Sequence, residues 1–286
     1  MDLLAELERN SAYAQKMNDV KQILSQKKVI VAFSGGRDSA LLSYLSSKYA
    51  KKTLSVFLRS ELSSSIEARQ AENFCKYYKI KFKNIPIKLL NIQMVQENST
   101  QRCYYCKQLS LSNLEEIADE KGYDLVVDGT NYSDLNQFRP GLQALKESKV
   151  ESPLALASIT KRDIIEISRL LNLISQNYSS QACLASRIPF GIPITNEILQ
   201  KIDKSENFIR SLLPNKHSPM RVRIQKLLPT EQLLARIEVD SEIYKVLSST
   251  ETRAKIVKKL HEYGFTYITV DLEGFQSGSM HRMLKK

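Results

Sequence analysis

The 286-residue sequence has few of the features that mark membrane, secreted or low-complexity proteins. It contains nine glycines and eight prolines and no biased tract, which excludes collagen-like, repeat and disordered architectures. Its apolar runs are short, such as residues 29–33, and this excludes a membrane-spanning helix. The acidic Asp2 stands where a signal peptide needs basic residues, and no apolar stretch follows it. We therefore expect a cytoplasmic protein with no membrane partner and with a sizeable core.

Histidine and cysteine, the residues that most often bind transition metals, are also scarce. Three histidines argue against a histidine-built metal site. Four cysteines, in the reducing compartment expected here, indicate metal binding or reactivity rather than structural disulfides.

Charge of one sign dominates. The chain has 42 Lys and Arg against 31 Asp and Glu, a net charge of +11. Such an excess favours polyanionic partners such as nucleotides, phosphates or RNA. Residues 76–107 alone hold seven basic side chains and one acid, and this basic segment is either a solvated face or a binding patch.

Strand-like and helical segments alternate through the first part of the chain. The β-branched run 28–33 is typical of a buried parallel strand. The alternation predicts an α/β domain with a parallel sheet covered on both faces and with ligands at the carboxyl ends of its strands. The other predicted strands cover 53–58, 80–85 and 125–128, and the predicted helices cover 1–26, 38–49, 63–78, 109–121 and 160–171.

A long loop rich in Ser, Pro and Gly, residues 175–195, indicates a domain boundary. Helices are predicted beyond it at 196–213 and 242–263, and strands at 221–225, 235–239 and 265–272, which together form a small α+β unit. The sequence thus predicts two domains, 1–175 and 176–286.

The strongest chemical signal is the glycine loop after the first strand. Glycines let backbone amides turn toward an anion, serines add hydroxyls, and the following helix N-terminus adds partial positive charge. The loop is neither a Walker A motif nor a dinucleotide fingerprint, and without a ligand it would be a capped strand–helix turn. Its sequence is Ser34-Gly35-Gly36-Arg37-Asp38-Ser39.

This string resembles the pyrophosphate loop of the PP-loop ATP pyrophosphatases, which have an adenine nucleotide alpha hydrolase-like fold. The resemblance implies that ATP is cleaved between its α- and β-phosphates, giving an adenylated substrate and pyrophosphate. Members include NAD, GMP and argininosuccinate synthetases, tRNA thiolases and sulfur transferases, and the loop alone does not choose among them.

Further strings, in order from about residue 15 to 283, resemble the LarE family of sulfur transferases. LarE enzymes convert the carboxylates of pyridinium-3,5-biscarboxylic acid mononucleotide to thiocarboxylates, on the route to the nickel-pincer nucleotide cofactor of lactate racemase. They form homo-oligomers, including hexamers, and the sequence does not identify the sulfide donor. The strings are Phe57-Leu-Arg-Ser-Glu61, Asp128-Gly-Thr-Asn131, Phe138-Arg-Pro-Gly141, Ser152-Pro-Leu154, Ala182-Cys-Leu-Ala-Ser-Arg-Ile-Pro-Phe-Gly191, Arg221-Val-Arg223 and Ala235-Arg-Ile-Glu238.

The resemblance implies roles for the loop and for a second strand end. A carboxylate resists attack by a sulfur anion, so ATP must first activate it as an adenylate. Asp38 would orient the loop or Mg²⁺, with Cys183 and Ser39 as the other catalytic residues, although the aspartates could instead be helix and turn caps. The expected ATP-binding residues are Ser34, Gly35, Gly36, Asp38, Ser39, Asp128, Gly129 and Thr130.

Arginines are the natural partners of the substrate's phosphate and carboxylates. Arg221 and Arg223 alternate with one valine, so both project from one strand face and are expected to bind a phosphate; the alternative is a surface pair without a ligand. By resemblance, the substrate-binding set extends to Ser186, Arg187 and Glu206.

The cysteines bear on the source of sulfur. Cys103 and Cys106 could ligate one metal, and Cys183 lies in the 182–191 string. In one LarE branch three such cysteines hold a 4Fe-4S cluster whose open iron carries sulfide, which we expect here. In another branch the loop cysteine gives up its own sulfur and becomes dehydroalanine. The Cys-x-x-Cys pair could also bind zinc or form a redox disulfide, and Cys75 is expected to be a buried apolar residue.

Two features fit the LarE pattern less well. Residues 133–138 are less acidic than expected, and Arg37 occupies a variable loop position from which its side chain could point outward. The main alternative is a tRNA thiolase, which would use the basic surface, but no RNA-binding module is visible and nucleic acid is not expected. A non-enzymatic nucleotide-binding protein is the remaining alternative.

Overall fold

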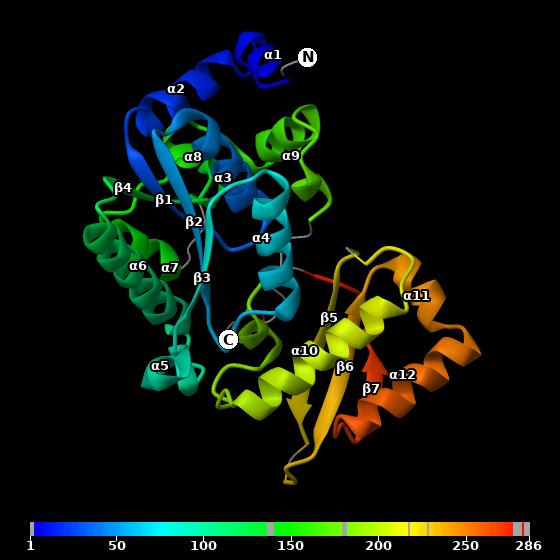
Figure 1. Cartoon of the computed structure of the whole chain (residues 1–286). Coiled ribbons are helices and arrows are strands. Elements are labelled where there is room, and N and C mark those ends of the chain that lie inside the picture. Colours follow the sequence, from blue (N-terminus) through cyan, green and yellow to red (C-terminus); the bar gives the residue numbers. More distant parts are fainter. Residues whose placement is uncertain are drawn as a thin grey trace. The chain divides into compact units, whose positions relative to one another are not determined.

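The computed structural model describes residues 3–135, 140–178, 182–216, 218–227, 229–276 and 282. These residues belong to two compact units, whose elements are labelled in Figure 1. Unit 1 comprises residues 1–60, 65–89 and 101–181, and unit 2 comprises residues 61–64, 90–100 and 182–286. The division into domains at residue 175 stays a prediction. Phe138 and Arg139, from one of the LarE-like strings, lie outside the described residues.

Unit 1 is built on a parallel sheet of four strands in the order β3-β2-β1-β4. Strand β1 (Lys28–Ala32) pairs with β2 (Lys52–Arg59) and with β4 (Leu125–Asp128), and β2 pairs with β3 (Phe82–Pro86). Ala32 lies opposite both Val56 and Asp128, so the strands present their carboxyl ends at one edge. The predicted α/β fold is confirmed.

Helices cover both faces of this sheet, as predicted. Val29 and Val31 of β1 join a core with residues of α2 (Ala14–Leu24), α3 (Arg37–Tyr49) and α9 (Lys161–Leu170). Ile30 points to the opposite face, because side chains alternate along a strand, and packs with residues of α6 (Arg102–Lys121). The remaining helices of unit 1 are α1 (Leu3–Arg9), α4 (Ser65–Tyr77), α7 (Pro140–Lys146) and α8 (Pro153–Leu156).

In unit 1, helix boundaries depart from the sequence predictions in two places that matter. The segment 1–26 forms two helices, α1 and α2, instead of one. Helix α6 begins at Arg102, seven residues before the predicted start, and so includes the Cys103–Cys106 pair in its first turns. The hydrophobic periodicity did not reveal this extension, because the added residues are charged, polar, tyrosine and cysteine side chains without an apolar stripe.

Unit 2 contains a mixed sheet of three strands. Strand β5 (Met220–Lys226) pairs antiparallel with β6 (Leu233–Val239), which pairs parallel with β7 (Tyr267–Val270). Helix α10 (Asn196–Ser211) packs on β5, and α12 (Thr250–Glu262) packs on β7 and α10. The predicted helix 242–263 is divided into α11 (Ser241–Leu247) and α12, because Ser249 caps a new helix start by accepting a hydrogen bond from the Thr252 amide. The short α5 (Gln93–Gln96) also belongs to this unit.

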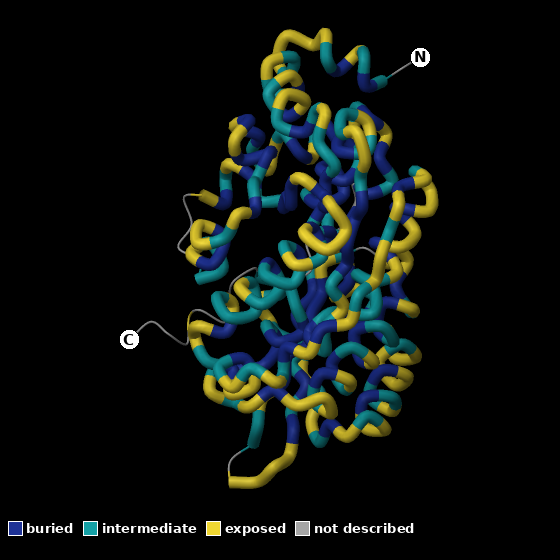
Figure 2. Tube along the Cα trace, turned by 60° about the vertical axis from the view of Figure 1, so that its left-hand side comes forward, coloured by how far each residue is buried: buried dark blue, intermediate teal, exposed yellow. Residues whose placement is uncertain are grey.

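Burial alternates along the helices of both units, as the dark blue and yellow segments of Figure 2 show. This is the pattern of helices that pack by one side. Within the described ranges, no helix combines the length and the apolar character needed to cross a bilayer.

Part of the basic segment 76–107 has a structural explanation. Strand β3 is an edge strand of the unit 1 sheet, and Lys81, Lys83 and Lys88 in and beside it are exposed. Lysines on an edge strand oppose pairing with the edge of another sheet. These side chains therefore have a role that requires no nucleic acid.

Candidate functional site

The glycine loop joins β1 to α3, and close backbone contacts fix its shape. Gly35 has a φ of +77°, and a Cβ there would lie 2.6 Å from the carbonyl oxygen of Glu67. Gly129, just after β4, approaches the loop so closely that a Cβ would lie 2.9 Å from the Ser39 amide nitrogen. Side chains are excluded at both positions, so the backbone of the β4 end meets the start of α3 directly.

Two serines hold the loop closed. The hydroxyls of Ser34 and Ser39 are 3.0 Å apart, and Ser39 Oγ also accepts a hydrogen bond from the Ser34 amide at 3.2 Å. Ser39 Oγ lies 3.1 Å from the Gly36 carbonyl oxygen, to which it can donate. Gly36 is the N-cap of α3 and supplies no side-chain acceptor, so the first amides of the helix are available to an anion.

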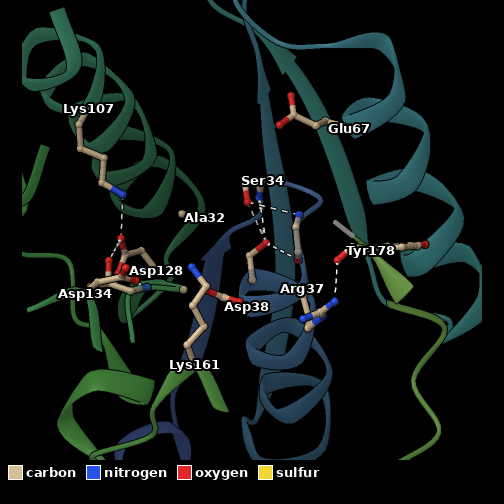
Figure 3. A pocket seen from close by; sticks show the side chains of 14 residues that line it. Ala32, Ser34, Arg37, Asp38, Glu67, Lys107, Asp128, Asp134, Lys161 and Tyr178 are labelled. Atoms are coloured by element: carbon tan, nitrogen blue, oxygen red, sulfur yellow. Dashed lines mark hydrogen bonds and ion pairs between the residues drawn. The ribbon is translucent and has the colours of Figure 1, made fainter. Parts of the chain in front are cut away.

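These groups open on a pocket of about 260 Å³ in unit 1. It lies at the carboxyl ends of β1 and β4, where ligands of open α/β sheets bind. Figure 3 shows its side chains. The lining residues are Ala32, Ser34, Gly36, Arg37, Asp38, Ser39, Glu67, Lys107, Asp128, Gly129, Thr130, Asp134, Lys161 and Tyr178.

Asp128, the last residue of β4, is buried and held by three side chains. Lys107 of α6 forms an ion pair with Asp128 Oδ2 at 2.7 Å, and the hydroxyls of Thr130 and Ser152 donate to the carboxylate at 2.8 and 2.6 Å. Burial opposes ionisation, but the Lys107 charge and these hydrogen bonds outweigh it and hold the pKa of Asp128 below its ordinary value. Asp128 is therefore a fixed anion at the pocket wall.

Asp38, in the first turn of α3, is only half-buried. Asn131 Nδ2 donates to Asp38 Oδ2 at 3.0 Å and to Asp134 Oδ2 at 2.7 Å, so one amide links two carboxylates. Burial raises the pKa of Asp38, the Asp134 charge adds to the rise, and Lys161 and Asn131 oppose it. Because its surroundings disfavour the charged form, the Asp38 carboxylate would be stabilised by an added cation.

The structure brings together seven of the eight residues expected to bind ATP, while Gly35 shapes the turn behind them. Sequence reasoning missed Lys107, Lys161 and Tyr178, which come from elements distant along the chain, and Asp134, which lies just after the Asp-Gly-Thr-Asn string. Asn131 belongs to the Asp-Gly-Thr-Asn string and could have been found from it. Arg37 differs from expectation, because its side chain lines the pocket instead of pointing outward.

The donor set of the pocket fits Mg²⁺ carried in by a nucleotide. Its carboxylates offer the oxygen ligands that Mg²⁺ prefers, but among the described residues no three His, Cys, Asp or Glu side chains form a ready metal site. Mg²⁺ in nucleotide sites usually binds one or two carboxylates plus substrate phosphates, and Asp38 meets that need.

In unit 2, Arg187 and Glu206 form a fully buried ion pair. The guanidinium Nε and Nη2 donate to the two carboxylate oxygens at 2.8 and 2.9 Å. Glu206 Oε1 also accepts from the Val222 amide on edge strand β5 at 3.0 Å. Burial opposes ionisation of Glu206, yet Arg187 and Arg210 hold its pKa below the ordinary value.

Arg223 and Arg221 lie on one face of β5, as the alternation predicted. Arg223 Nε pairs with Glu238 Oε1 at 2.5 Å, and its Nη1 donates to the carbonyl oxygen of Ser186 at 2.5 Å. Arg221 instead stacks on the ring of Phe275, 4.6 Å from its centroid. Within the described part of the chain, the Arg221 guanidinium has no hydrogen-bonding acceptor, although only 6% of the residue's surface is exposed.

Burial and two neighbouring guanidinium groups disfavour the charge of Arg221. Burial, followed by the charges of Arg187 and Arg223, lowers its pKa to about 10. The predicted substrate-binding arginines are thus unequal: two of them already bind carboxylates, and Arg221 retains donors for an anion.

The predicted metal ligands lie in different units. Cys103 and Cys106 are one helical turn apart at the start of α6, in unit 1, with Cys103 exposed. Cys183 precedes the 3₁₀ helix Leu184–Arg187 in unit 2. No group of three metal-ligating side chains is assembled in the described residues. Cys75 is buried, as expected, and burial raises its pKa to about 12.

Comparison with known proteins agrees with this geometry. The PP-loop domain family matches residues 7–215. An uncharacterized protein of Methanocaldococcus jannaschii is 35% identical over 260 residues, 91% of this chain and 95% of the other. An uncharacterized protein of Synechocystis is 33% identical over 275 residues, 95% and 98% of the two chains. Pyridinium-3,5-bisthiocarboxylic acid mononucleotide synthase of Lactiplantibacillus plantarum is 29% identical over 276 residues, 95% of each chain.

Proposed function

The chain belongs to the PP-loop domain family, and from this premise we propose that it adenylates the carboxylates of pyridinium-3,5-biscarboxylic acid mononucleotide and replaces the AMP by sulfur. The chain is an ATP-dependent sulfur-transferring enzyme, as the family match and the Lactiplantibacillus relative together indicate. The substrate rests on the likeness to that relative, which extends over 95% of both chains.

The observation that carries the adenylation step is the pocket. A substrate carboxylate oxygen attacks the α-phosphorus of ATP, the bond from that phosphorus to the bridging oxygen breaks, and pyrophosphate leaves with the bond's electrons. The Ser34–Ser39 loop and the first amides of α3 would hold the pyrophosphate. Asp38 would ligate the Mg²⁺ of Mg-ATP, and the Asp128–Lys107 pair would fix the wall beside it.

Arg221 is the residue best placed to hold the substrate phosphate. Its guanidinium retains donors for an anion. Arg187 and Arg223 are each paired with a carboxylate, but their charges still lower the Arg221 pKa, so positive charge remains beside Arg221. We assign to Arg187, Glu206 and Ser186 the task of shaping this face: Arg187 Nη1 donates to Ser186 Oγ at 3.0 Å.

Sulfur delivery is the second part of the proposal. Cys103, Cys106 and Cys183 would hold a 4Fe-4S cluster, which when bound supplies sulfide at an iron without a protein ligand. The alternative is that Cys183 gives up its own sulfur. The protein is proposed to act as a homo-oligomer, the hexamer of the LarE resemblance being the form to test.

One experiment tests the reaction and the sulfur source together. Anaerobically reconstituted protein is mixed with Mg-ATP, sulfide and the biscarboxylic acid mononucleotide, and the products are read by mass spectrometry. Thiocarboxylate in excess over enzyme is expected. A yield capped at one sulfur per chain, with Cys183 converted to dehydroalanine, would keep the reaction and overturn the cluster. ATP-dependent thiolation of tRNA, with no product from the mononucleotide, would overturn the function.

The cluster has a separate test. Replacement of Cys103 by Ser should remove bound iron and multiple turnover, whereas Cys75→Ser is the matched control because Cys75 is not proposed as a ligand. Iron content is measured directly. A Cys103→Ser protein with full iron would refute the ligand set.

A further inference from the structure

Arg37 lies in the variable position of the glycine loop, and its side chain faces the nucleotide pocket. It is the first residue of α3, and its Nη2 donates a hydrogen bond to the carbonyl oxygen of Tyr178 at 2.9 Å. Figure 3 shows this bond beside the loop serines. Tyr178 lines the same pocket, so one protein contact fixes the direction of the guanidinium.

Two local costs attach to an arginine at this place. A helix N-terminus carries partial positive charge, so a cation in the first turn of α3 is disfavoured. In addition, Arg37 Nε is buried and has no hydrogen-bond partner among the described residues. Sequence choices that oppose the local structure are expected at functional sites. An anion bound at this helix end would offset both costs, because the helix and the guanidinium attract it together.

The other cations of the pocket act more strongly on its carboxylates. Lys107 is paired with Asp128, and Asp38 feels the charge of Lys161 more strongly than that of Arg37. Among the described residues, the Arg37 side chain donates its hydrogen bond to a neutral carbonyl and forms no ion pair. Its charge is therefore the least compensated of the three.

We propose that Arg37 binds the β- and γ-phosphates of ATP and stabilises pyrophosphate as it leaves. The proposal rests on the proposed function, since it concerns the leaving group of that adenylation. As the bond between the α-phosphorus and the bridging oxygen breaks, negative charge accumulates on the β-phosphate. A guanidinium, with planar paired donors, suits phosphate oxygens better than a lysine does. Arg37 would thus act on the phosphates, and Tyr178 would orient it.

The test compares ligands that contain or lack this phosphate end. Binding of inorganic pyrophosphate, ATP and AMP, each with Mg²⁺, is measured by calorimetry on the full chain. Arg37→Gln should weaken pyrophosphate and ATP binding by roughly 10-fold or more and leave AMP binding unchanged. Arg37→Lys should lie between the two, because it keeps the charge and loses the paired donors.

Arg162→Gln is the matched control. It removes the same charge from an exposed residue of α9 that does not line the pocket. It should leave all three affinities unchanged.

Two results would overturn the assignment: unchanged pyrophosphate affinity in Arg37→Gln, or an equal loss for AMP and pyrophosphate. If Arg37→Gln does not fold by circular dichroism, Arg37→Lys decides alone, by whether pyrophosphate affinity falls relative to AMP. Pyrophosphate binding needs no sulfur chemistry. A chain that binds pyrophosphate through Arg37 yet forms no thiocarboxylate would therefore refute the proposed function and keep this assignment.

Discussion

In unit 1 the acidic side chains of the pocket contact hydroxyls, an amide and a partly exposed lysine. In unit 2 the buried carboxylates instead form ion pairs with buried guanidinium groups. The Asp38 pKa is raised and that of Glu206 is lowered, although burial pushes both upward. The difference lies in the partners. A carboxylate left short of positive charge is ready for an added cation, while one already paired holds the fold together.

The first prediction breaks the paired side of this comparison. Glu206→Ala leaves Arg187 as a buried charge without its carboxylate, and breaking such a pair costs about 3–5 kcal/mol. Urea unfolding followed by circular dichroism measures the loss. Glu197→Ala, which removes an exposed carboxylate from the same helix, should cost far less. Equal losses would show that the buried pair has no special structural role.

The pH dependence of this pair has a definite sign. The folded-state pKa of Glu206 lies below its ordinary value of 4.5, so its contribution to stability is present above about pH 4.5 and is lost as the pH falls through the folded-state pKa. The acid-side slope of stability should be shallower in Glu206→Ala than in the parent.

The second prediction breaks the unpaired side. Asp38→Asn keeps the side-chain shape and removes the charge that would ligate Mg²⁺, so ATP-dependent pyrophosphate release should fall on the order of 100-fold or more. The free energy of unfolding should not fall, because the raised pKa means that the folded protein disfavours this charge. Release at the parent rate would remove Asp38 from the mechanism.

The third prediction concerns the Lys107–Asp128 pair, which stands between the two cases. Lys107→Gln should cost about 1–2 kcal/mol, less than a fully buried pair, because the Lys107 side chain is 31% exposed and two hydroxyls still contact Asp128. Because the folded-state pKa of Asp128 is lowered, this carboxylate stabilises the parent above its ordinary pKa, and the contribution is lost as the pH falls through the folded-state pKa. The variant should lose this acid-side dependence. Unfolding curves from about pH 3 to 7 compare the two; parallel curves would contradict the assignment.

These comparisons also show what sequence can supply. Alternating strands and helices predicted the parallel sheet, and a contiguous string predicted the loop, because each signal is local in the chain. Lys107, Lys161 and Tyr178 could not be predicted, since their place depends on how α6, α9 and the segment after it pack. The Arg223–Glu238 pair crosses two strands, and only their register brings the charges together.

The smallest effect on stability is expected at Arg221. Like Asp38 in unit 1, it is a charged group that forms no ion pair with the described residues. Arg221→Gln loses the stacking on Phe275 but relieves repulsion from Arg187 and Arg223, so the free energy of unfolding should change by less than about 1 kcal/mol. Affinity for the mononucleotide should nevertheless fall roughly 10-fold, because its phosphate loses a charged partner. Arg223→Gln is the contrasting variant. It leaves Glu238 without its closest cation, so it should lower the free energy of unfolding more than Arg221→Gln does. If both variants lost stability equally, Arg221 would be one more structural arginine, and the phosphate would have to bind elsewhere.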